Sequence, residues 1–379
     1  MLFMAGIYIH IPFCGKKCLY CDFYSLASMK ESGDFLKELK HEIILQKNYL
    51  GRDAVTSVYF GGGTPSLLHP SKITQILDCI SSHHNLASGC EVTLEANPED
   101  ITEKYIRELI KTPVNRLSIG IQCFNDSLLK ILNRRHNAGQ GENALRIVLD
   151  RGYTNVSADL IYGLPGMTAE EWSSTLEKIL SFNIRHLSAY ILTTEPGTPL
   201  AILIEKGNLL LPDEADIEEQ FGILVETTAG NGFIHYEISN FGKEGFFSGH
   251  NVACWKGEKY LGLGPSAHSF NGSTRQWNVS SISEYITALA RSNLPCTVEN
   301  IGKIQRYNEY VMTSLRTMWG ADLEYIQSGF GKEYGKHCIA RARKYVDSGL
   351  LKKSERCLAL SKAGMMLSDG IIAELFMAG

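Results

Sequence analysis

The stretch that decides the fold is Ile7-Tyr8-Ile9-His10-Ile11-Pro12-Phe13-Cys14-Gly15-Lys16-Lys17-Cys18-Leu19-Tyr20-Cys21. Its first five residues are mostly apolar and β-rich, and Pro12, which has no backbone N–H, ends the strand that they predict. Cys14, Cys18 and Cys21 therefore lie together in the loop after this strand. Clustered thiolates are ligands of iron–sulfur centres or of zinc.

The cysteine spacing favours a [4Fe–4S] cluster over zinc. A structural zinc site needs a fourth Cys or His at finger-like spacing, and none follows Cys21. Three thiolates on a four-iron cluster leave one iron open. That iron can chelate the amino and carboxylate groups of S-adenosylmethionine and cleave the molecule reductively. We therefore predict a metal centre on Cys14, Cys18 and Cys21, with S-adenosylmethionine as the second cofactor.

The first half of the chain alternates between β-rich runs and amphipathic segments, which implies parallel βαβ units. Six units are too few for a closed eight-stranded barrel, and the periodicity alone leaves an open sheet possible. Polar residues and glycines gather at the carboxyl end of each run, where both architectures place their sites. The predicted strands are 7–11, 55–60, 91–94, 116–121, 155–161 and 186–192, and the helical segments between them are 34–50, 71–82, 101–110, 143–150 and 169–180.

Past residue 193 the alternation ends. An acidic helix is predicted there over 213–220. Within the alternating first half, Asn97-Pro98-Glu99-Asp100 is typical of a helix start. Clear helical patterns cover 306–318 and 333–348. We expect a barrel with the cluster in residues 1–235, a connecting region in 236–280 and a mainly helical C-terminal domain in 281–379.

Composition narrows the class of protein. The net charge of −4 provides no basic surface of the kind that nucleic-acid binding needs. No segment approaches the roughly 18 apolar residues of a membrane span, and residues 1–6 lack the basic start and long apolar run of a signal peptide. We therefore expect a cytoplasmic protein without nucleic-acid partners, whose ten cysteines are thiols or metal ligands rather than disulfides.

Residues 8–24 resemble the radical SAM group that contains the oxygen-independent coproporphyrinogen dehydrogenases and the HemW-type haem chaperones. The resemblance implies an α/β fold, a partial (β/α)6 radical SAM barrel, followed by a C-terminal, mainly helical domain. It covers nearly the whole chain and continues through 60–66, 95–98, 116–124, 132–136, 158–165 and 367–369.

The resemblance also implies S-adenosylmethionine contacts at the ends of all six predicted strands. Asp159 lies within an apolar run and is costly to bury unpaired, and the planar fork of Arg134 suits a carboxylate. Taken alone, Arg134 also fits a basic helix face, Glu95 a solvated turn and Tyr20 core packing. The implied contacts are Tyr8, Tyr20, Gly62, Gly63, Thr64, Glu95, Gln122, Arg134, Asp159 and Thr193, and no residue is assigned a catalytic role.

Two differences from the coproporphyrinogen dehydrogenases favour the HemW-type branch of this group. The coproporphyrinogen dehydrogenases carry a longer N-terminal extension and a further cysteine two residues after the third, whereas this strand begins at Ile7 and that position holds Phe23. The HemW-type branch carries a haem-binding His-Asn motif followed by an aromatic pair. Gly249-His250-Asn251-Val252-Ala253-Cys254-Trp255 matches it except at Cys254, where the family usually has Tyr.

We expect the His-Asn motif to lie on an exposed loop, where the neutral imidazole of His250 can serve as an axial ligand of haem iron. Cys254 is either a second, thiolate ligand or a buried inert thiol. The resulting hypothesis is a haem chaperone that binds haem and transfers it to acceptor proteins. The alternative is an enzyme that decarboxylates the propionates of coproporphyrinogen III through a 5′-deoxyadenosyl radical. A radical SAM enzyme with an unrelated substrate is a third possibility, which nothing in the sequence favours.

Overall fold

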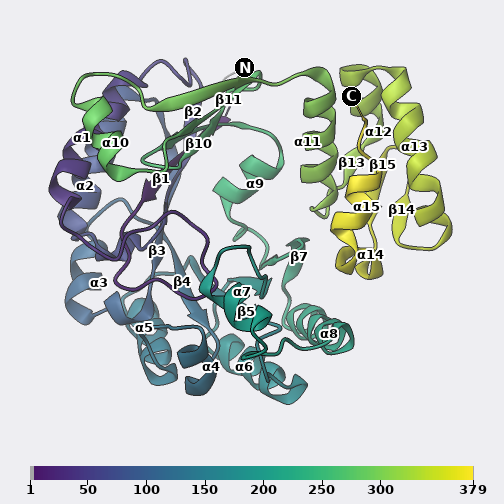
Figure 1. Cartoon of the computed structure of the whole chain (residues 1–379), viewed down its shortest axis with the longest axis horizontal. Coiled ribbons are helices and arrows are strands. Elements are labelled where there is room, and N and C mark those ends of the chain that lie inside the picture. Colours follow the sequence, from purple (N-terminus) through teal and green to yellow (C-terminus); the bar gives the residue numbers. More distant parts are fainter. Residues whose placement is uncertain (1–3, 379) are drawn as a thin grey trace.

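The computed structural model describes residues 4–378. Residues 1–3, which belong to the segment predicted not to be a signal peptide, lie outside the described residues. One large sheet dominates, and a smaller lobe lies beside it (Figure 1). The six predicted strands form the centre of the sheet, all parallel and in sequence order, which confirms the predicted α/β fold. They are β1 (Met4–Ile11), β2 (Ala54–Gly62), β3 (Leu86–Ala96), β4 (Arg116–Gln122), β5 (Val156–Tyr162) and β6 (His186–Ile191).

The outer face of this parallel sheet is apolar and covered by helices. Ile7, Ile9 and Ile11 alternate along β1 and are fully buried, as period-two side-chain direction requires. Each crossover helix turns an apolar stripe toward them, as Phe35 and Leu39 of α1 do. The covering helices are α1 (Ser32–Leu45), α2 (Pro70–His83), α3 (Glu103–Leu109), α4 (Asp126–Ile131), α5 (Ala138–Asp150) and α6 (Ala169–Ser181).

The sheet is wider than the sequence predicts, because both edges carry extra strands. They give a 12-stranded sheet in the order β12-β11-β10-β9-β1-β2-β3-β4-β5-β6-β8-β7. These strands were not predicted, since strands of three to five residues are too short to show a periodicity. The added strands are β7 (Ile234–Glu237), β8 (Asn240–Gly242), β9 (Lys259–Leu263), β10 (His268–Phe270), β11 (Thr274–Asn278) and β12 (Cys296–Asn300).

The C-terminal lobe has its own hydrophobic core, whose first member is Tyr307. Helix α10 (Ile282–Leu289) packs on α1 in the core of the large sheet, and β12 extends that sheet. The first helix that joins the core of the lobe is α11 (Lys303–Leu315), since helical periodicity does not reveal which core a helix joins. Its other elements are β13 (Ala321–Asp322), α12 (Leu323–Tyr325), the π-helical turn Ile326–Phe330, α13 (Lys332–Asp347), β14 (Leu351–Lys353), β15 (Cys357–Leu360), α14 (Lys362–Met366) and α15 (Ser368–Glu374).

Helix starts differ from the prediction at one functional position. Asn97 caps nothing: Pro98–Asp100 is a short 3-10 turn, and α3 begins at Glu103, where Thr102 Oγ1 accepts a hydrogen bond from Tyr105 N at 3.1 Å. The side chain of Asn97 is free to act elsewhere. The acidic helix α8 runs from Glu214 to Gly230, longer than predicted, and is preceded by α7 (Pro199–Glu205).

Helix α9 (Gly249–Trp255) lies against the concave side of the sheet, between β1, β2 and β9 and the C-terminal lobe (Figure 1). It carries the His-Asn motif. Among residues 4–378, no helix is both long and apolar enough to cross a membrane.

Candidate functional site

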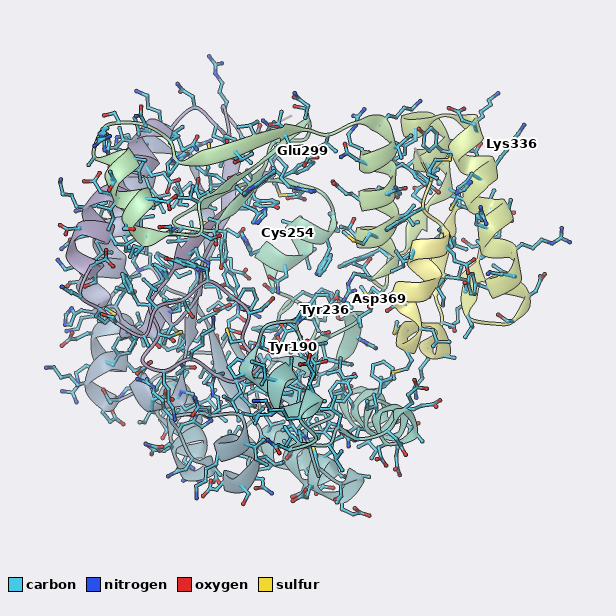
Figure 2. All side chains as sticks on the ribbon, in the orientation of Figure 1. Tyr190, Tyr236, Cys254, Glu299, Lys336 and Asp369 are labelled. Carbon is cyan, nitrogen blue, oxygen red and sulfur yellow. The ribbon has the colours of Figure 1, made fainter. Side chains whose placement is uncertain are left out.

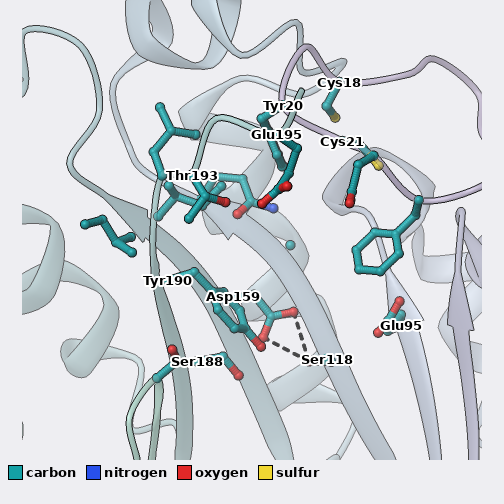
Figure 3. A pocket seen from close by; sticks show the side chains of 18 of the residues that line it. Cys18, Tyr20, Cys21, Glu95, Ser118, Asp159, Ser188, Tyr190, Thr193 and Glu195 are labelled. Atoms are coloured by element: carbon teal, nitrogen blue, oxygen red, sulfur yellow. Dashed lines mark hydrogen bonds between the residues drawn. The ribbon is translucent and has the colours of Figure 1, made fainter. Parts of the chain in front are cut away.

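A cavity of about 690 Å³ opens at the carboxyl ends of the parallel strands. This volume is typical of small-molecule sites. Figure 3 shows Cys18 and Cys21 on one side of it and Asp159 and Tyr190 deeper between the strands. Twelve of the residues predicted from the sequence line it: Cys14, Cys18, Cys21, Tyr20, Gly62, Gly63, Thr64, Glu95, Gln122, Arg134, Asp159 and Thr193.

A chain of hydrogen bonds joins two of the cysteines around this cavity. Thr64 Oγ1 donates to Cys14 Sγ at 3.4 Å and accepts from Asn97 Nδ2 at 3.1 Å. Asn97 Oδ1 accepts from Arg134 Nη2 at 2.7 Å, and Arg134 Nη1 lies 3.3 Å from Cys18 Sγ. Residues from the ends of β2 and β3, from the turn after α4 and from the cysteine loop thus hold one another. The sequence analysis missed this network because it assigned Asn97 to a helix cap.

The glycines after β2 allow close packing against the strand that leads into the cysteine loop. Gly62 has φ +105°, and a Cβ there would lie 2.7 Å from the His10 ring. A Cβ on Gly63 would lie 2.5 Å from the carbonyl oxygen of Phe13, just before Cys14. Only glycine avoids both clashes, and the end of β2 therefore supports the cysteine loop directly.

The donor set fits a [4Fe–4S] cluster better than a single metal ion. Within residues 4–378, no three His, Cys, Asp or Glu side chains converge as one ion would require, and all three loop thiols are free of disulfides. In a cluster each thiolate binds a different iron, so such convergence is not needed. Cys14, Cys18 and Cys21 are the only cysteines among the described residues that line the cavity, which leaves one iron open for another ligand.

Two buried carboxyl groups lie deeper in the cavity. Burial raises the pKa of Glu95 to about 7, although its Oε1 accepts a hydrogen bond from Tyr59 at 2.8 Å. Burial likewise raises the pKa of Asp159, which Ser118 Oγ contacts at 3.0 and 2.9 Å (Figure 3). Their side-chain partners here are hydroxyl groups, the Gly62 backbone also bonds to Glu95, and each carboxyl group retains capacity to accept a hydrogen bond from a ligand.

Tyr8 is the exception among the residues predicted to contact S-adenosylmethionine, since it is absent from the described lining of the cavity. Its ring stacks on Tyr59 with centroids 6.1 Å apart, and its hydroxyl lies 3.3 Å from His10 Nδ1. Even-numbered residues of β1 point to the concave side, but Tyr8 sits one pleat below the strand end. Its observed role is packing beneath the site.

His250 does not lie on an exposed loop, so that expectation is wrong. It is on α9, only 6% exposed, and its Nδ1 lies 2.9 Å from Ser57 Oγ. Burial lowers the pKa of His250 to about 4, so the ring is neutral at pH 7. Gly6 makes room for it, because a Cβ there would lie 3.0 Å from the imidazole. The sequence could not reveal this packing, since 193 residues separate Ser57 from His250.

The other residues of the His-Asn motif contact different parts of the structure. Asn251 lines the cavity. Burial raises the pKa of Cys254 to about 12, which favours the buried, inert thiol over a thiolate ligand. Trp255 packs under the guanidinium of Arg316, 5.4 Å from the ring centroid. The motif therefore connects the strands of the barrel to the C-terminal lobe.

Sequence reasoning missed several residues that complete the cavity. Arg116 places a charge within a predicted apolar strand, and this charge could have identified it as a residue of the site. Of the residues from the C-terminal lobe, only Ser368 and Asp369 lie in a segment (367–369) that resembles the family. The missed lining residues include Asn97, Arg116, Ser118, Ser188, Tyr190, Ser239, Arg316, Met365, Met366, Ser368 and Asp369.

A parallel partial barrel with three loop cysteines and one open cavity at its strand ends defines a radical SAM protein. The family model of the Radical SAM superfamily matches residues 8–179. The chain is 32% identical to the haem chaperone HemW of Mycobacterium tuberculosis (strain H37Rv) over 375 residues, which cover 98% of this chain and 94% of that protein. It is 31% identical to HemW of Bacillus subtilis (strain 168) over 371 residues, 97% of this chain and 98% of the relative.

The chain therefore belongs to the HemW-like family of the radical SAM superfamily. This membership implies a [4Fe–4S] cluster and S-adenosylmethionine. Among solved structures, coproporphyrinogen III oxidase (HemN) from Escherichia coli is similar with a TM-score of 0.85 and 21% identity, covering 99% of this chain and 91% of that one. At that identity the similarity shows a shared fold alone.

Proposed function

We propose that this protein is a haem chaperone that binds haem and transfers it to acceptor proteins. The observation that carries the proposal is the identity of 31–32% with proteins named haem chaperone over nearly the full length of both chains. Phe23, which is 63% exposed beside the cavity, stands where the coproporphyrinogen dehydrogenases carry their further cysteine. Location in the cytoplasm stays a prediction.

In this proposal Cys14, Cys18 and Cys21 hold the cluster, and S-adenosylmethionine binds between it and the strand ends. Bound there, the cluster would supply an open iron for the amino and carboxylate groups of S-adenosylmethionine. Arg134 suits a ligand carboxylate beside Cys18, because its guanidinium is already oriented by Asn97 and by the Gly120 carbonyl at 2.9 Å. The other proposed contacts also line the cavity: Tyr20, Gly62, Gly63, Thr64, Glu95, Gln122, Asp159 and Thr193.

The first prediction separates carrier from enzyme. Reconstituted protein, incubated anaerobically with a reductant, S-adenosylmethionine and coproporphyrinogen III, is expected to yield no protoporphyrinogen IX above background. The same preparation is expected to bind haem, seen as a Soret band, and to release it to an apo-haem protein such as apomyoglobin. The Escherichia coli HemN enzyme serves as the positive control. Product formation at catalytic turnover would contradict the proposal and favour the coproporphyrinogen dehydrogenase alternative.

The second prediction concerns His250 as the proposed axial ligand. Because its ring is packed between Ser57 and Tyr59, ligation requires α9 to move away from β1 and β2. His250→Ala is expected to weaken haem binding by at least about tenfold and to change the Soret spectrum, since an iron ligand is lost. The measurement is a spectrophotometric haem titration, with circular dichroism to verify folding.

Ser57→Ala is the matched control for this titration. It removes the hydroxyl that holds His250 Nδ1 in place but leaves the imidazole present. If His250 ligates haem, Ser57→Ala is expected to bind haem as tightly as wild type or more tightly, with an unchanged Soret band. Equal losses in both variants would assign His250 to the packing of α9 and remove it from the haem site.

A further inference from the structure

Arg316 joins the barrel to the C-terminal lobe at the mouth of the cavity. It follows α11, and its Nε lies 3.4 Å from Glu237 Oε1 on β7. Its Nη1 lies 3.3 Å from Asp369 Oδ1 on α15, and Figure 2 shows Asp369 on the side of the lobe that faces the barrel. The Trp255 ring packs against the guanidinium. The arginine is therefore oriented by groups from three separate segments.

The bonding capacity of this guanidinium is only partly used. Its Nε is buried without a well-formed hydrogen bond, and Nη2 has no hydrogen-bond partner among residues 4–378. Glu237 is shared, because its other oxygen accepts from Ser239 N at 3.1 Å and Asn240 Nδ2 at 2.6 Å. The side chain of Asp369 is 92% exposed, and such exposed ion pairs contribute little free energy. A ligand carboxylate can replace Asp369 at small cost.

The other cationic residues that line the cavity belong to the barrel and not to the C-terminal lobe. Arg134 is bonded to the cysteine loop, Asn97 and Gly120. Lys17 Nζ donates to the Phe23 carbonyl at 3.3 Å. Arg116 lies on β4 with Glu91 Oε2 4.0 Å away. Among the described residues, Arg316 is thus the cation at the lobe side of the cavity that can accept an anionic group from a ligand.

The surroundings of Arg316 indicate what that ligand looks like. Met365 and Met366 of α14 and Ile238 line the same cavity as Arg316, and the Trp255 ring packs against its guanidinium. An apolar wall next to one guanidinium suits a large apolar molecule with a carboxylate at its edge, because arginine binds carboxylates through two parallel hydrogen bonds. Haem has this chemistry, since its apolar macrocycle carries propionates on one edge.

We infer that Arg316 binds a propionate of haem and that Asp369 occupies its place when haem is absent. This inference rests on the proposed function and adds to it the residue that recognises the anionic edge. Haem then lies against Met365 and Met366, with its propionate edge at Arg316. Exchange of Asp369 for the ligand couples binding to the contact between lobe and barrel.

The test compares haem with its dimethyl ester, in which both propionates are neutral, by Soret titration of the reconstituted full chain. Wild type is expected to bind haem about tenfold more tightly than the ester, and Arg316→Gln is expected to lose that preference by binding haem about tenfold less tightly. Asp369→Asn, which removes the competing carboxylate, is expected to bind haem at least as tightly as wild type.

Arg275→Gln is the matched control. Arg275 Nη2 pairs with Glu309 Oε1 at 2.7 Å and also links the sheet to α11, but it is not among the described residues that line the cavity. It is expected to keep the full preference of wild type for haem over the ester. Should Arg316→Gln fail to fold, Arg316→Lys, which keeps the charge but not the fork, is expected to show a reduced preference.

The outcomes separate this inference from the proposed function. Wild type that binds haem and its ester equally, or Arg316→Gln that keeps the wild-type preference, would overturn the role of Arg316 and leave the haem chaperone intact. An equal loss of preference in Arg275→Gln would attribute the effect to docking of the lobe and also overturn the inference. Failure of wild type to bind haem at all would overturn both.

Discussion

Cys18→Ser is expected to abolish the brown absorbance of the reconstituted protein and to lower its iron content from about four atoms per chain to near zero. Cys18 is one of three thiols around the cavity, and its Sγ lies 3.3 Å from Arg134 Nη1. A hydroxyl does not replace a thiolate on iron, since soft sulfur ligands select this cluster. S-adenosylmethionine binding is expected to fall with it, because the open iron disappears. Iron analysis and anaerobic spectroscopy check both.

Cys79→Ser is the control for this result. Cys79 is a half-buried thiol on α2, outside the described lining of the cavity, whose Sγ lies 3.7 Å from the Lys40 carbonyl. It is expected to keep the full iron content. If Cys18→Ser retained about four irons per chain while folded, the assignment of the cluster to the three loop cysteines would be wrong.

Glu42→Ala is expected to destabilise the protein by roughly 3–5 kcal/mol, the largest stability effect that we predict. Glu42 is fully buried on α1 and accepts hydrogen bonds from Gly264 N at 2.8 Å, Tyr285 at 2.5 Å and Asn278 Nδ2 at 2.6 Å. These partners lie in the β9–β10 turn, in α10 and in β11. Alanine leaves three buried donors without an acceptor, and denaturant unfolding measures the cost.

The pH dependence of the free energy of unfolding provides a second measurement at Glu42. Burial raises the pKa of Glu42 to about 7 from its ordinary 4.5, so the folded state binds this proton more tightly than the unfolded state. Its contribution to stability is therefore fully present below about pH 4.5 and declines as the pH rises to about 7. Glu42→Gln, which does not ionise, is expected to remove this part of the slope.

Lys37→Ala, on the exposed side of the same helix, is the matched control for Glu42. Lys37 is 76% exposed and pairs with Glu38, so its loss is expected to change stability by less than about 1 kcal/mol. If Glu42→Ala were no more destabilising than Lys37→Ala, the hydrogen bonds that Glu42 accepts would not stabilise the packing of α10 and the added strands against α1.

The cysteine loop, the central strands and part of the cavity lining could be predicted from the sequence. These features depend on short-range information: period-two apolar runs predict the strands, Pro12 ends the first one, and parallel topology brings every strand end to one edge. The resemblance to the radical SAM group added individual residues on these strands, such as Glu95 and Asp159, and both line the cavity.

Tertiary structure alone decided the positions that depend on contacts between distant segments. His250 is buried because Gly6 and Ser57 make a place for it on the concave side of the sheet. The side chain of Asn97 bridges Thr64 and Arg134 instead of capping a helix. Arg316 reaches the cavity only because the C-terminal lobe packs against the barrel. Local patterns contain no record of such partners, since each is chosen by packing between residues far apart in the chain.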